Sequence, residues 1–171
     1  MKKIILVIFT LIFIGNLLAC DSSNSMTYEA KRAELIRIVD NVIDPLQEHT
    51  FKTYNIAYEL SPEFSVKNAD REDEILNKLN ERHNLLREAI TEAEKIIDTS
   101  FEEVQMLRDR FMVINYMLDE GINSFIEAFK NDDEEMFKSA MEIIEKVDSD
   151  YTDFSKEILA VAQEYKIVPV E

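Results

Sequence analysis

The stretch that decides the fold is residues 132–165, DDEEMFKSAMEIIEKVDSDYTDFSKEILAVAQEY. Its apolar residues recur at alternating spacings of three and four, which is the pattern of one buried stripe along an α-helix. They are Phe137, Ala140, Ile144, Val147, Tyr151, Phe154, Ile158, Val161 and Tyr165. Two glycines and three prolines in 171 residues are too few for the turns of a sandwich or barrel. The sequence therefore predicts an all-α protein.

The ends of this helix carry recognisable signals. Asp132 is the expected N-cap, because Glu135 follows three residues later as in a capping box. Pro169 lies just beyond the other end. About 33 helical residues at about 1.5 Å each make a rod about 50 Å long. A rod with one apolar stripe buries that stripe against other helices, so we expect a bundle.

A similar stripe occupies residues 27–60, although Pro45 interrupts it. We expect the helix either to kink near residues 41–45 or to restart there, with Asp44 as the cap. Residues 61–65, SPEFS, have the composition of a loop. The stripe consists of Leu35, Val39, Val42, Leu46, Ile56 and Leu60.

Residues 70–130 allow two interpretations. Asp98, Thr99 and Ser100 are poor helix formers, and Ser100 with Glu103 makes a capping box, so the chain would turn there. However, the apolar residues on both sides share one heptad phase, as in a single helix of about 60 residues. Gly121 marks either a close helix approach or a bend. Both versions predict an elongated antiparallel bundle of three to four long helices over residues 27–168. The shared stripe consists of Leu76, Leu79, His83, Leu86, Ile90, Ala93, Ile97, Val104, Leu107, Phe111, Ile114, Leu118, Phe125 and Ala128.

The N-terminal residues differ from the rest of the chain. Lys2 and Lys3 precede an apolar run over residues 4–14, which has the length of a signal-peptide core and is shorter than a membrane-spanning helix. Leu17-Leu18-Ala19-Cys20 then resembles the lipobox of bacterial lipoproteins. The resemblance implies cleavage after Ala19 and a diacylglyceryl group on Cys20, the only cysteine in the chain. Residues 1–19 are the expected signal peptide, and residues 20–26 are the lipidated end and a short linker.

These features predict a protein anchored by lipid to the outer, extracytoplasmic face of the cell membrane. In a bacterium with two membranes, Asp21 resembles a signal for retention in the inner one; in a bacterium with a single membrane it has no special meaning. Removal of residues 1–19 takes away Lys2 and Lys3, so the net charge changes from −16 to −18 (17 basic against 35 acidic residues). Anionic headgroups repel this charge, so the lipid would provide the attachment. The same charge argues against nucleic-acid binding, which needs a basic face.

The candidate metal sites in the sequence are weak. Di-metal carboxylate bundles carry Glu-x-x-His, but Asn80 precedes His83 and Leu46 precedes His49 at that spacing. Residues 148–153, DSDYTD, resemble the start of a calcium loop, yet Asp153 and Leu159 occupy the positions that need glycine and glutamate. We therefore predict no metal, and we expect this acidic stretch to be the solvated face of a helix.

No catalytic motif is present: the sequence lacks Gly-x-Ser-x-Gly, a glycine-rich phosphate loop and His-Glu-x-x-His. We predict that the protein is not an enzyme and has no catalytic residues and no cofactor. Phe51, Tyr54 and Tyr58 form a second stripe, and Phe64 follows in the expected loop. We interpret this stripe as additional core rather than as an exposed binding patch.

The leading functional hypothesis is a membrane-tethered, non-catalytic interaction module. Its partner would be an envelope or extracellular protein, or the cell wall. The mature part is also faintly similar to small helical lipoproteins of Gram-positive bacteria, some of which are described as binding the cell wall. The alternative is a bundle that binds a small ligand or metal in its core, around His83 or His49.

Overall fold

The computed structural model describes residues 24–66, 69–96 and 99–167, and every regular element in them is helical. The predicted all-α class is confirmed. The expected signal peptide, Cys20 and the C-terminal residues from 168 onward lie outside the described part. The elements are α2 (Asn24–Ile38), the π-helix η2 (Val39–Ile43), α3 (Asp44–Val66), α4 (Ala69–Glu94), α5 (Glu102–Asn131) and α6 (Glu134–Glu164).

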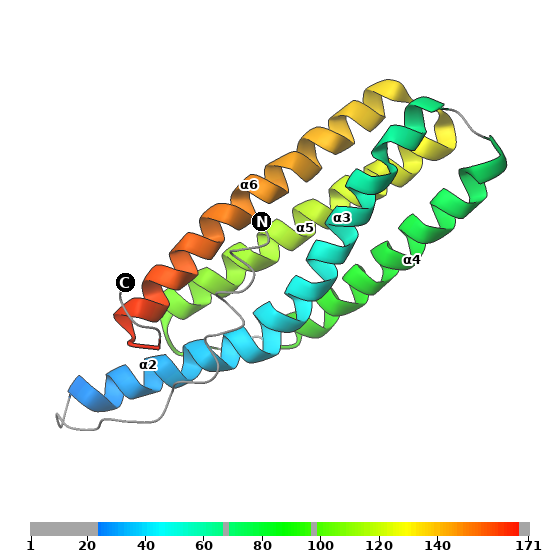
Figure 1. Cartoon of the computed structure of the whole chain (residues 1–171). Coiled ribbons are helices and arrows are strands. Elements are labelled where there is room, and N and C mark those ends of the chain that lie inside the picture. The colour runs from blue at the N-terminus through cyan, green and yellow to red at the C-terminus, as the bar shows by residue number, and fades with distance from the viewer. Residues whose placement is uncertain (1–23, 67–68, 97–98, 168–171) are drawn as a thin grey trace.

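The helices α3 to α6 form an elongated bundle in which successive helices run antiparallel (Figure 1). α3 packs against α4, α4 against α5, and α5 against α6. Aromatic side chains connect α6 to α3 and close the bundle. The ring centroids of Phe51 on α3 and Tyr151 on α6 lie 4.8 Å apart. With 31 residues, α6 is about 46 Å long. This is the bundle that the apolar stripes predict.

The chain between α4 and α5 settles the ambiguity over residues 70–130 in favour of two helices. α4 ends at Glu94 and α5 begins at Glu102. The predicted Ser100 cap is wrong, because the N-cap residue is Phe101 and it makes no side-chain capping bond. Instead, the Phe101 N–H donates to the Thr99 hydroxyl, 3.2 Å away, within the turn. The heptad phase continues across the break because both helices turn their stripes toward one core.

The expected loop at residues 61–65 is wrong, because α3 continues to Val66. Pro62 has no N–H to offer the carbonyl of Tyr58, one turn earlier. The Ser61 hydroxyl donates to that oxygen instead, at 3.0 Å. Farther along the same turn, the ring of Phe64 stacks on Phe137 of α6, with centroids 4.0 Å apart. Tertiary packing and one local hydrogen bond thus keep helical a segment whose composition favours a loop.

The predicted irregularity near residues 41–45 is a π turn, and the helix does not restart there. The Asp44 N–H donates to the carbonyl of Val39, five residues back. Pro45 has no N–H, so the carbonyl of Asp40 has no main-chain donor in either the α or the π pattern. Figure 1 shows α2 and α3 meeting at an angle here.

The turn between α5 and α6 shifts the predicted cap by one residue. Asp133, not Asp132, caps α6 and accepts a hydrogen bond from the Met136 N–H at 2.9 Å. Asp132 adopts a left-handed conformation, with φ of 53°, and ends α5. The acidic residues at this turn are therefore accounted for by helix ends, as expected.

Gly121 marks a close approach and not a bend, since α5 is continuous through it. A β-carbon at this position would lie 3.1 Å from Ile143 Cγ2 and 3.1 Å from Ile144 Cγ1 on α6. These distances are shorter than ordinary carbon contacts. The missing side chain thus allows α5 and α6 to pack tightly.

One hydrophobic core runs through all the helices, from Tyr28 to Ile167. All nine stripe residues of α6 are buried or half-buried. Phe111 and Phe154, both fully buried, stack near the middle with centroids 5.1 Å apart. All members of this core among the described residues fall within residues 24–171. Within the described ranges, we find no helix with both the length and the apolar character needed to cross a membrane.

Candidate functional site

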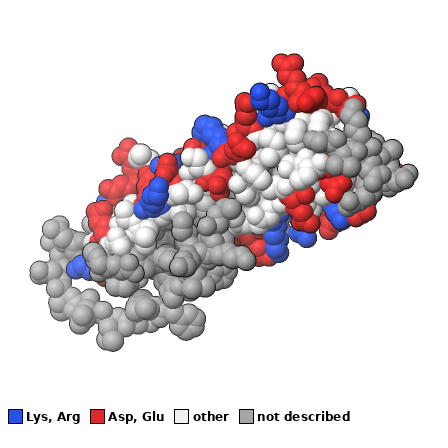
Figure 2. Space-filling model, turned by 45° about the horizontal axis from the view of Figure 1, so that its top comes forward, with Lys and Arg blue, Asp and Glu red and all other residues white. Residues whose placement is uncertain are grey.

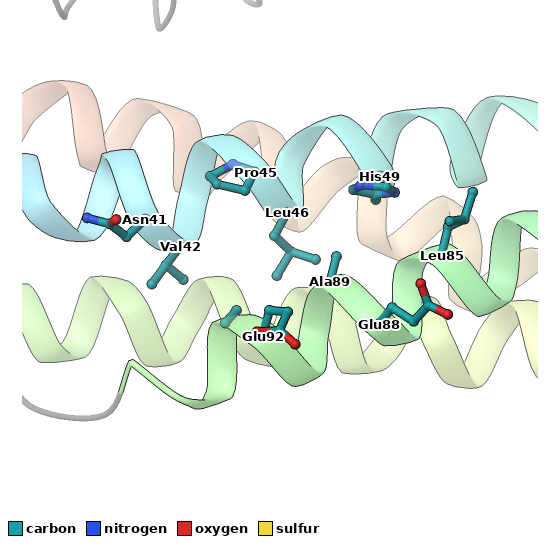
Figure 3. A pocket seen from close by; sticks show the side chains of 10 residues that line it. Asn41, Val42, Pro45, Leu46, His49, Leu85, Glu88, Ala89 and Glu92 are labelled. Atoms are coloured by element: carbon teal, nitrogen blue, oxygen red, sulfur yellow. The ribbon is translucent and has the colours of Figure 1, made fainter.

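A shallow groove of about 290 Å³ lies between η2 and α3 on one side and α4 on the other (Figure 3). Its floor is apolar, and polar side chains stand on its rim. The floor consists of Val42, Pro45, Leu46, Leu85, Ala89 and Ala93, and the rim of Asn41, His49, Glu88 and Glu92. Of the residues singled out in the sequence as candidate ligands, only His49 lies here.

The groove forms because the facing residues of α4 are small. Ala89 and Ala93 occupy successive turns, whereas the larger Leu86 and Ile90 turn into the core and are buried there. Opposite them, Figure 3 shows Leu46 pointing from α3 toward Ala89, with Glu92 to one side and Glu88 to the other. The space between the two helices is therefore left partly unfilled at this level.

The rim offers hydrogen-bond acceptors and negative charge. Among the described residues, none pairs with the Glu88 carboxylate or bonds the ring of His49. Glu92 pairs with Lys95 at 2.5 Å. The Asn41 amide donates its Nδ2 proton to the carbonyl of Arg37 at 2.7 Å, and its oxygen can still accept a hydrogen bond. None of the ten described lining residues is a lysine or an arginine.

His83 lies away from the groove, in a different environment from His49. It is buried between α4 and α5, and its Nε2 lies 2.6 Å from Asp119 Oδ1. Arg87 Nε stands 3.6 Å from the same oxygen. This pairing satisfies the imidazole locally, as expected for a core histidine. Within residues 24–66, 69–96 and 99–167, no three histidine, cysteine, aspartate or glutamate side chains cluster closely enough to hold a metal ion.

The pairing predicts the effect of removing Asp119. Asp119→Ala leaves a buried imidazole nitrogen without its partner, which costs about 1–3 kcal/mol of unfolding free energy. Adding His83→Leu to that variant removes the stranded polar group as well. We therefore expect the double variant to be more stable than Asp119→Ala alone. Urea unfolding followed by circular dichroism measures both, and equal stability of the two variants would contradict the pairing.

The aromatic stripe of α3 belongs to the core, as interpreted from the sequence. Tyr54 and Phe64 are buried, and Phe51 and Tyr58 are half-buried against the core cluster. The centroids of Tyr54 and Tyr58 lie 4.7 Å apart. The stretch 148–153 lies within α6 and forms no loop, so it has the helical geometry that was predicted for it.

Sequence reasoning missed a set of polar groups inside the bundle. The Thr50 hydroxyl lies within hydrogen-bond distance of Asn115 Oδ1, and the Asn115 amide donates to the carbonyl of Phe111 at 2.8 Å. The Tyr151 hydroxyl is buried without a partner among the described residues. Burial raises the pKa of the Tyr151 hydroxyl, and the nearby Asp44 carboxyl raises it further. The pKa of Asp44 is itself raised by burial and then by Asp40.

A second missed feature is a row of exposed apolar side chains on the outer face of α5. Met106, Val113 and Tyr116 are 62%, 54% and 43% exposed. These residues fall between the stripe positions that the heptad pattern assigns to the core, so periodicity alone does not single them out. The Tyr116 hydroxyl donates to Glu94 Oε1 at 2.7 Å, which fixes this ring beside α4. We call these three residues the α5 patch.

With 35 acidic and 19 basic residues, the chain as a whole is acidic. Figure 2 shows acidic side chains along both edges of one face of the bundle, with an uncharged area between them. No protein-family model, curated protein or solved structure matches this chain. The functional conclusion therefore depends on the residues and their geometry alone.

Proposed function

We propose that the protein is a lipid-anchored bacterial lipoprotein that acts as a non-catalytic interaction module at the outer face of the cell membrane. The observation that carries this proposal is the single cysteine, Cys20, which ends a lipobox-like Leu17-Leu18-Ala19-Cys20 after a short apolar run. Two acyl chains are sufficient for stable membrane attachment, so a bundle with a charged surface needs no further membrane contact.

The contacts of α2 support a defined orientation for such an anchor. The Tyr28 hydroxyl donates to the carbonyl of Glu164 at 3.1 Å, and Lys31 pairs with Glu103 at 3.1 Å. These bonds hold the start of α2 against the C-terminal end of α6 and the N-terminal end of α5. Cys20 precedes α2 by only a few residues, each spanning at most about 3.5 Å. A lipid on Cys20 would keep this end near the membrane and direct the turn between α5 and α6 outward.

Two features of the described surface support an interaction role. The α5 patch exposes three large apolar side chains on a protein of net charge −16. The groove beside α4 joins an apolar floor to an acidic rim. Exposed apolar residues surrounded by charge are typical of surfaces that contact other macromolecules. The partner in this proposal is an envelope or extracellular protein, or the cell wall.

The test is recovery of a partner from intact cells with residues 24–171 as bait. We expect an envelope protein or peptidoglycan to be enriched with the wild-type bait. It should be lost with a bait carrying Met106→Glu and Val113→Glu, which place charge in the α5 patch. A bait with Lys138→Glu, an exposed change on α6, is the control. The proposal would be contradicted if all three baits recovered the same material. It would also be contradicted if the wild-type bait recovered neither an envelope protein nor peptidoglycan.

A further inference from the structure

The chemistry of the groove points to one kind of occupant. Leu46 and Ala89 make an apolar floor, and the Glu88 carboxylate stands beside it without a cation from the described residues. We propose that the groove receives a lysine or arginine side chain of a partner protein. The methylene stem lies over Leu46 and Ala89, and the charged head pairs with Glu88. This inference rests on the proposed interaction role.

The dimensions of the groove fit one long side chain. Its volume of about 290 Å³ is at the lower end of the range for small-molecule pockets. The stem of lysine or arginine is apolar and readily covers apolar surface while the head stays at the rim. A purely apolar side chain would cover the floor equally well but would leave the acidic rim unpaired.

The electrostatics of the rim select a cation. The acceptors on the rim are the Glu88 carboxylate and the Asn41 amide oxygen. Two cations close to Glu88 along the chain face other carboxylates, one of which, Glu92, is itself on the rim, so Glu88 is the rim carboxylate that no described cation faces. Arg87 faces Asp119 at 3.6 Å, and Lys95 pairs with Glu92 at 2.5 Å.

The overall charge supports the same choice of partner. A surface of net charge −16 attracts a basic segment and repels an acidic one. A second copy of this chain carries the same charge and is therefore disfavoured as the occupant. The partner that fits is a protein with a basic segment whose lysine or arginine is accessible.

The two histidines make the test direct. In residues 24–171 labelled with ¹³C and ¹⁵N at histidine, the ring of His49 reports on the groove and the buried ring of His83 is an internal control. The probe is an acetylated, amidated peptide in which lysines stand one helical turn apart among alanine and leucine. Twin peptides carry norleucine or glutamate in place of lysine. We expect the lysine peptide alone to shift the His49 signals in a saturable way, with the His83 signals unchanged.

Charge reversal tests the role of Glu88. We expect Glu88→Lys to weaken binding of the lysine peptide about tenfold or more, because like charges then face each other. Glu142→Lys on α6, the helix diagonal to α4, changes the net charge by the same amount at an exposed position. This control should bind nearly as the wild type does. Equal weakening by both changes would show a long-range charge effect and overturn the proposal.

Filling the groove tests its shape without changing charge. Ala89→Leu should abolish the His49 shift, because the added side chain occupies the floor. Ala160→Leu, an exposed change on α6, should leave the shift intact. If the norleucine or glutamate peptide shifts His49 as the lysine peptide does, the groove does not select cations. If butylammonium alone binds as tightly as the peptide, the occupant is a free amine and not a protein.

The failure of this inference is distinguishable from failure of the proposed function. A bait carrying Glu88→Lys that still recovers the wild-type partner from cells would remove the groove from the contact and leave the interaction role standing. A wild-type bait that recovers nothing would remove the interaction role. In that case the peptide titration still decides whether the groove binds a cationic side chain.

Discussion

Replacing Cys20 with serine is expected to abolish lipid attachment and processing after Ala19. A serine hydroxyl cannot form the thioether that the lipobox resemblance implies. Each acyl methylene that is buried in the bilayer contributes about 0.8 kcal/mol, so loss of both chains removes the attachment. In cells given labelled palmitate, the wild-type protein should carry label and the Cys20→Ser variant none. The variant should also keep residues 1–19 and migrate as a larger chain.

A matched control separates the position of the cysteine from its presence. Ser25→Cys in the Cys20→Ser background restores one thiol per chain a few residues downstream. We expect this double variant to remain unlabelled, because the thiol no longer follows Leu17-Leu18-Ala19. Incorporation of label by the Cys20→Ser variant, or its normal processing, would contradict the lipoprotein proposal.

Truncating Phe111 to alanine is expected to have the largest effect on stability among the core positions. The Phe111 side chain is 0% exposed, and its ring stacks on Phe154 with centroids 5.1 Å apart. It also meets Tyr151 edge-on at 6.1 Å. Removing a fully buried phenylalanine costs about 3–5 kcal/mol, because the loss of apolar burial is joined by a cavity. Urea unfolding followed by helical circular dichroism measures the loss.

Two further substitutions provide reference values for the stability loss of Phe111→Ala. Met106→Ala lies on the same helix but on its exposed face, so we expect a change within about 0.5 kcal/mol. Phe111→Leu keeps most of the apolar volume and should lose less than Phe111→Ala. A loss below about 1 kcal/mol for Phe111→Ala would mean that this ring is not at the centre of the core.

Local sequence signals predicted the start of α6, whereas the end of α3 depends on tertiary contacts. The cap of α6 was predicted within one residue, at Asp132 instead of Asp133, because either aspartate can accept from the first helical turn. The loop expected at residues 61–65 was wrong, since its composition conceals the bond from Ser61 to Tyr58 and the stacking of Phe64 on Phe137. The second contact spans distant parts of the chain, and no local pattern contains it.

Among the functional features too, some could be interpreted from the sequence and others only from the structure. His83 was interpreted as a core histidine from its place on an apolar stripe, but its partner Asp119 lies 36 residues away and is unrecognisable from spacing. The groove was not predicted at all. It forms where two alanines of α4 face the π turn and the start of α3. The sequence of either helix alone does not show that these two segments are neighbours.

Spacing along single segments was enough to predict the helical class and the burial of one stripe per helix, and it also contains the lipobox-like motif on which the lipoprotein proposal rests. Each of these follows from residue spacing along a single segment, where the periodicity of a helix or a short linear motif is complete. Tertiary packing was needed to show that Gly121 lets α5 approach α6, that the α5 patch is exposed, and that Glu88 stands beside an apolar groove without a partner among the described residues. These depend on which helices become neighbours, because packing between surfaces determines which side chains are covered and which remain available.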